Sequence, residues 1–165
     1  MHIAKVSINT LNQLRDLLSK LDDSVYTQVI PETSHASIGQ HVRHILGFYT
    51  CLIGQAPSKK VSYDKREREI SLETSCQAAI ITIDDINVSV KKMNENDEFV
   101  LEGELAGEIH HIKTNMKREM LYALEHAVHH MAIIKITVKI LKIEANLSAG
   151  FGIAESTIKH KKCAQ

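Results

Sequence analysis

The chain has 165 residues, of which 44% are apolar and 24% are charged. This composition is typical of a soluble globular domain that is long enough to bury a core. Its 20 basic residues balance 20 acidic residues, so charge does not favour nucleic-acid binding. Apolar runs all fall short of the roughly 18 residues that a membrane span needs. Because residues 1–5 are too short and mixed to begin a signal peptide, we expect a cytoplasmic protein without membrane or nucleic-acid partners.

Cysteine, proline and glycine usage narrows the fold class. The three cysteines are far apart and form no CxxC pair, which argues against a disulfide framework and against a zinc ribbon. Only two prolines and seven glycines occur, which favours long uninterrupted helices over a turn-rich β fold.

The first half of the chain contains two helical patterns. Leucines at positions 11, 14, 17, 18 and 21 predict an amphipathic helix, with Asn9 or Thr10 as a plausible N-cap. A second helix is expected to begin at Ser37, because Ser37 and Gln40 have the spacing of a capping box. Gly54 and then Pro57 are its stop signals.

The second half begins after a polar stretch at residues 55–70. A third helix is predicted over about residues 72–93, although its Ile-Thr-Ile and Val-Ser-Val stretches alternate as strands do. Residues 99–112 then predict a short hairpin or an irregular loop. Thr114 or Asn115 caps the longest helix, at about residues 116–143, whose apolar residues recur at steps of four and three.

Together these patterns predict an all-α four-helix bundle, with the short hairpin or irregular loop before the last long helix. No repeat or composition shift divides the chain, so residues 1–165 are expected to form a single domain. Bundles of this kind place metal ions between facing helices. His126 and His130 lie to one side of the apolar seam of the last helix, which predicts a cavity at the edge of the bundle.

The histidines are the candidate metal ligands. The chain has ten, and three lie in the segment His126-Ala127-Val128-His129-His130. Side chains four residues apart on a helix lie one above the other, so His126 and His130 can reach one ion, and a histidine of another helix can complete the set. Imidazole suits zinc, nickel, iron and copper alike. Ala127 follows His126, so the HExxH motif of zinc proteases is absent.

Several alternatives stand beside this interpretation. With ten histidines an i, i+4 pair is not rare, and histidines on exposed helix faces are common. His129 competes for the second position, at i+3 from His126. On the second helix, His41 and His44 compete for the third.

The two segments in combination resemble a known family. Ser37-Ile38-Gly39-Gln40-His41-Val42-Arg43-His44-Ile45, followed much later by Glu125-His126-Ala127-Val128-His129-His130, is similar to the DinB/YfiT family of metal-binding four-helix bundles. The resemblance covers residues 11–143. Carried over position by position, it implies that the metal ligands are His44, His126 and His130. It also implies a divalent ion, with zinc or nickel favoured over iron.

The resemblance further implies a class of reaction. Family members with assigned activities resemble S-transferases that act on low-molecular-weight thiols, and many members have no known reaction. A divalent cation lowers the pKa of a bound thiol, which then attacks an electrophile. Two alternatives are a non-catalytic bundle that binds a small molecule or dimerises, with a vestigial or structural metal site, and a metal-dependent hydrolase. Related bundles are often homodimers.

Three residues are candidates for binding substrate. Arg43 is adjacent to His44 and has the charge to bind a carboxylate. Arg66 lies in the polar stretch with Tyr63 and Arg68, where an anionic substrate could enter. Tyr122 is one helical turn before His126. For each of them, an ordinary surface or core-edge position is the competing interpretation.

Overall fold

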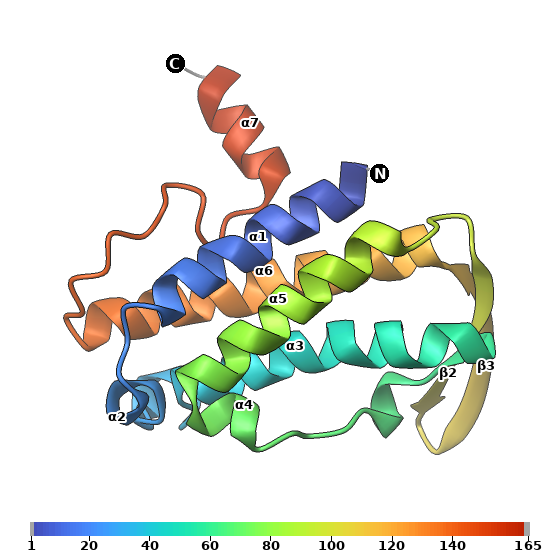
Figure 1. Ribbon diagram of the computed structural model, residues 1–165, viewed down its shortest axis with the longest axis horizontal. Coiled ribbons are helices and arrows are strands. Elements are labelled where there is room, and N and C mark those ends of the chain that lie inside the picture. The colour runs from blue at the N-terminus through green and yellow to red at the C-terminus, as the bar shows by residue number, and fades with distance from the viewer. Residues whose placement is uncertain (1, 164–165) are drawn as a thin grey trace.

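Four long helices form the body of the molecule. In a computed structural model, which describes residues 2–163, these are α1 (His2–Leu18), α3 (Ile38–Gln55), α5 (Cys76–Lys92) and α6 (Met116–Ile140). Both α1 and α3 contact α5 and α6, so the helices close a ring in the order α1, α5, α3, α6 (Figure 1). The prediction of a mainly helical bundle is therefore confirmed.

The helix starts follow local capping chemistry. Ser37 and Gln40 form the predicted capping box of α3, with the Ser37 hydroxyl accepting from the Gln40 amide at 3.1 Å. Asn115 caps α6 by accepting from the Arg118 amide at 3.0 Å. The predicted start of the first helix was wrong: α1 begins at His2, because Ala4 and Ser7 extend its buried face by two turns.

The predicted third helix is in fact two helices. Ser75 adopts an extended conformation and separates α4 (Ser71–Thr74) from α5. It is the N-cap of α5, because its hydroxyl accepts a hydrogen bond from the Ala78 amide. The strand-like alternation inside α5 forms helix instead. Ile83 faces the core, whereas Ile81 is 52% exposed, so the alternation comes from apolar residues on the outer surface.

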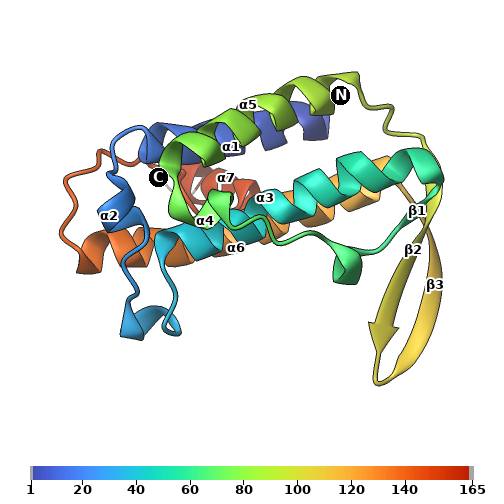
Figure 2. The same cartoon turned by 60° about the horizontal axis from the view of Figure 1, so that its bottom comes forward.

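A small sheet at one end of the bundle makes the all-α prediction incomplete. β2 (Glu98–Leu105) and β3 (Glu108–Asn115) form an antiparallel hairpin that extends from the end of the bundle (Figure 2). Ala106 and Gly107 turn it, both at positive φ. β1 (Lys60–Val61) pairs with β2 in parallel, and nothing in the polar stretch at residues 55–70 predicted this strand.

Shorter elements complete the described chain. They are α2 (Asp23–Tyr26), three 3-10 turns at Pro31–Thr33, Ala56–Ser58 and Tyr63–Lys65, and α7 (Glu155–Cys163). The sequence did not predict α7, which projects from the bundle beside α1 (Figure 1). Among the described residues, no helix is both long and apolar enough to cross a membrane.

Candidate metal centre

Three histidines from two facing helices, α3 and α6, meet in one cluster. His44 lies on α3, and His126 and His130 lie one turn apart on α6. Their ring centroids are separated by 4.8, 4.5 and 4.7 Å, nearly an equilateral triangle. One ring nitrogen from each lies within 4.8 Å of the other two, and each side chain is half-buried. The structure therefore brings together the three residues that the sequence resemblance selected.

The triangle favours neutral imidazoles. Burial, reinforced by the neighbouring histidines, lowers the pKa of His44 to about 4 and that of His130 to about 3. The pKa of His126 is lowered as well, mainly by burial. At neutral pH the three rings therefore hold free lone pairs, which is the form that binds a metal ion.

The arrangement fits a divalent ion. Two imidazole nitrogens on a tetrahedral zinc ion lie about 3.3 Å apart, given Zn–N bonds of about 2.0–2.1 Å. The observed limit of 4.8 Å exceeds this by an amount that small side-chain rotations can close. Nε2 of His126 is buried and has no hydrogen-bond partner among the described residues, so it is available as a ligand. Three protein ligands would leave at least one coordination position for water or substrate.

The two competing histidines take different places. His41 lies beside the triangle, with its Nδ1 3.0 Å from Nδ1 of His130, and is only 9% exposed. His129 is exposed and touches the His130 ring edge-on, at a centroid separation of 5.2 Å. Spacing alone did not distinguish these residues from the triangle. Their positions depend on how α3 packs against α6, and a sequence pattern within one helix does not contain that information.

An aromatic wall borders the triangle on one side. Phe48 lies 4.2 Å from the His126 ring and stacks on Tyr63 at 4.9 Å, measured between ring centroids. The guanidinium carbon of Arg66 lies 5.1 Å from the centroid of Phe48, a cation–π arrangement. Sequence reasoning did not select Phe48 as a site residue, although its i+4 spacing from His44 places both on one face of α3.

A buried carboxylate anchors this wall to α6. Glu119 is 0% exposed and accepts hydrogen bonds from the Tyr63 hydroxyl at 3.0 Å and from the Thr114 hydroxyl at 2.7 Å. Tyr63 in turn accepts a hydrogen bond from Arg66 through its backbone carbonyl, at 2.8 Å. This chain of contacts fixes the segment that carries Arg66 beside the histidines. No sequence pattern had pointed to Glu119.

The three predicted substrate-binding residues differ in surroundings. Arg66 is half-buried, and its charge contributes to the lowered pKa of His44 and His126. Arg43 forms an ion pair with Glu73 at 2.6 Å. Tyr122 is 36% exposed, with its ring 5.9 Å from that of His126. Their roles toward a substrate stay predictions.

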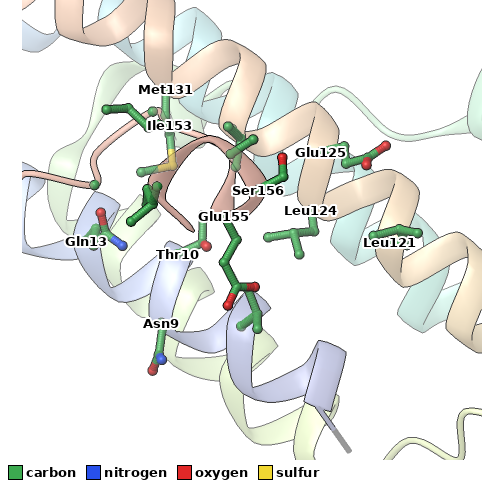
Figure 3. Close-up of a pocket in the computed structure, with 16 residues that line it drawn as sticks. Asn9, Thr10, Gln13, Leu121, Leu124, Glu125, Met131, Ile153, Glu155 and Ser156 are labelled. Atoms are coloured by element: carbon green, nitrogen blue, oxygen red, sulfur yellow. The ribbon is translucent and has the colours of Figure 1, made fainter. Parts of the chain in front are cut away.

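A separate cavity of about 600 Å³ lies between α1, α6 and α7. Figure 3 shows that α6 contributes Leu121, Leu124 and Met131 to it, facing Thr10 of α1 and Glu155 of α7. None of the histidines of the triangle lines this cavity. The cavity and the triangle therefore lie on different sides of α6.

Sequence comparison with known proteins matches only part of the chain. No family model matches the chain. FK506-binding protein 5 of Rhizopus delemar is 34% identical over 110 residues, which cover 62% of this chain and 28% of that protein. The chain thus spans well under half of the curated relative that it matches.

Among solved structures, a DinB-like protein from Bacillus subtilis, YjoA, matches with a TM-score of 0.66. The match covers 92% of this chain and 99% of that one, at 16% sequence identity. This similarity confirms the DinB-like fold that the sequence resemblance implied.

Proposed function

We propose that His44, His126 and His130 bind a divalent metal ion, and that the protein is a metal-dependent transferase acting on a low-molecular-weight thiol and an electrophile. The observation that carries the metal proposal is the convergence of three neutral imidazoles, one of which has a buried nitrogen without a partner in the described part of the chain. Zinc and nickel suit this all-imidazole donor set, and iron is a further candidate. When bound, such an ion would supply a Lewis acid that lowers the pKa of a thiol.

The charge around the triangle supports an anionic ligand. The ligand group contains histidines only, so the protein does not neutralise the charge of a divalent ion there. Arg66 adds a further positive charge, and no carboxylate pairs with it among the described ion pairs. A thiolate, carboxylate or hydroxide is therefore favoured over a neutral molecule. Arg66 would hold an acidic group of the substrate, and Phe48 would exclude water from one side.

Metal binding is tested first. The purified protein is analysed for metal and reconstituted separately with zinc and with nickel. We expect about one ion per chain, loss of that ion in His126→Ala, and its retention in the control His129→Ala, because His129 is exposed outside the triangle. A wild-type protein that takes up neither ion would contradict the proposal.

The reaction is tested on the metal-loaded protein. Glutathione, bacillithiol and mycothiol are each mixed with a generic electrophile, and loss of free thiol is followed over time. We expect conjugation above the spontaneous rate with at least one thiol, and none above background with His126→Ala. A loaded protein that hydrolyses esters or amides but leaves every thiol unreacted would favour the hydrolase alternative.

The cavity between α1, α6 and α7 supports a second candidate, a small-molecule-binding bundle without catalysis. Its size is within the usual range for small-molecule sites, and its lining is mainly apolar. An apolar fluorescent probe that binds wild type but not Leu124→Arg, together with no turnover in the thiol assays, would favour this candidate. The histidines would then hold a structural ion, whose removal should lower the melting temperature.

A further inference from the structure

We infer that His41 is a positioning residue for the metal centre: its Nδ1 accepts a hydrogen bond from the Nδ1–H of His130 and so holds the Nε2 lone pair of His130 free for the ion. This inference rests on the proposed metal site. It starts from one contact, the separation of 3.0 Å between the two Nδ1 atoms. At that distance one nitrogen must carry the hydrogen and the other must accept it.

Only one of the two hydrogen arrangements is compatible with metal binding by His130 in this geometry. If His41 donates, Nδ1 of His130 uses its lone pair on the hydrogen bond, and Nε2 of the same neutral ring carries the hydrogen. Neither nitrogen of His130 then has a lone pair for a metal. If His130 donates, its Nε2 lone pair is free. Ligand histidines generally donate their second ring N–H to such an outer partner.

The fold holds His41 firmly in this place. It lies in the first turn of α3, where its backbone amide donates to the carbonyl of Ser37 at 3.3 Å. Its side chain is 9% exposed, and its ring is tilted by 39° to that of His130. His41 and His44 are three residues apart, so one rigid helix carries both a ligand and the partner of another ligand.

The identity of the acceptor matters for the centre. Most ligand histidines donate to a carboxylate or to a backbone carbonyl. Here the acceptor is a neutral imidazole, whose own Nε2 is buried without a partner among the described residues. An imidazole orients His130 without adding negative charge near the ion. The centre therefore keeps its preference for an anionic ligand.

The main competing role for His41 is that of a fourth ligand. The two roles differ in the number of imidazoles around the ion and in which substitutions are tolerated. Asparagine places its side-chain oxygen close to the position of Nδ1 and accepts a hydrogen bond, but it is not an imidazole. Leucine fills a similar space and accepts nothing.

The experiment measures zinc affinity by competition with a chromophoric chelator, for wild type and for His41→Leu, His41→Asn and the control His129→Asn. The first variant should weaken zinc binding about 10- to 100-fold, the usual effect of removing an outer partner of a ligand histidine. His41→Asn should stay within about threefold of wild type, as should His129→Asn. X-ray absorption of zinc-loaded wild type should show three imidazoles, and nitrogen-15 NMR should place the His130 hydrogen on Nδ1.

Three results would overturn the inference. They are unchanged zinc affinity in His41→Leu, equal losses in His41→Asn and His41→Leu, and four imidazoles around zinc in wild type. The last measurement and the NMR assignment need no variant, so a misfolded His41→Leu protein does not weaken the test. A wild-type protein that binds no zinc at all would overturn the metal site and this inference together, whereas tight zinc binding by every variant would overturn the inference alone.

Discussion

Replacing Tyr63 with phenylalanine removes one hydroxyl from the buried contact that ties the aromatic wall to α6. The Tyr63 hydroxyl donates to Oε2 of Glu119 at 3.0 Å, and the Glu119 side chain is fully buried. The other two contacts of this carboxylate, from Thr114 and Arg118, both go to Oε1. In the variant, Oε2 therefore stays buried without a hydrogen bond.

The size of the effect follows from the charge of the acceptor. A hydrogen bond to a charged group contributes about 1.5–3 kcal/mol to stability. Because the carboxylate oxygen is buried, no water molecule replaces the lost donor. With a urea m-value of about 2 kcal/mol/M for a domain of this size, the denaturation midpoint should fall by about 0.7–1.5 M. Tyr122→Phe is the matched control, because Tyr122 is 36% exposed and no hydrogen bond of its hydroxyl is present among the described residues. Its change should stay within about 0.5 kcal/mol.

The assay is equilibrium urea denaturation of the metal-free protein at pH 7.5, followed by far-UV circular dichroism. Zinc affinity measured on the same Tyr63→Phe sample should stay close to wild type, because Arg66 donates to the backbone carbonyl of residue 63 and not to its hydroxyl. A midpoint for Tyr63→Phe equal to that of Tyr122→Phe would refute the assignment of the Glu119 contact as stabilising.

Two further predictions concern the pH dependence and the packing of the bundle. Burial and the neighbouring histidines lower the pKa of His44 to about 4 and that of His130 to about 3, from about 6.5 in the unfolded chain. Between the folded and unfolded values the unfolded chain therefore binds more protons than the folded one. The free energy of unfolding of the metal-free protein should therefore fall as pH decreases from about 6.5 to 4. The dependence of this free energy on pH should be weaker in His130→Asn, and an equal dependence in both proteins would contradict the pKa assignment. Gly39→Ala should destabilise the protein by about 2–3 kcal/mol in urea denaturation, because the added Cβ would lie 2.8 Å from the backbone carbonyl carbon of Glu73. Gly54→Ala is the control, because its added Cβ would meet no atom within 4 Å, and it should be neutral or stabilising by up to about 1 kcal/mol. Similar losses of stability in both variants would contradict the packing of α3 on α4.

Local sequence signals predicted the elements that depend on neighbours in the chain. The capping box of α3 and the N-cap of α6 were predicted because each capping side chain and its backbone partner are three residues apart. A short hairpin or an irregular loop was expected because two apolar segments flank Gly103 and Gly107, and Gly107 takes the positive φ of the hairpin turn. Elements that depend on distant partners were missed. β1 has only two residues and exists because it pairs with β2, forty residues later.

The candidate site divides in the same way. The spacing of His126 and His130 fixes that both lie on one face of a helix, and the resemblance added His44 on another helix. The first is a consequence of helical periodicity, which the amino-acid order contains. The second came from the family resemblance, because spacing alone left His41 and His44 as alternatives. Other features of the site required the packing of α3 on α6. That packing places His41 beside His130, leaves His129 on the exposed side, and brings Phe48, Arg66 and Glu119 to the border of the site. Those contacts join residues up to 89 positions apart, and only the folded chain brings such residues within hydrogen-bonding distance.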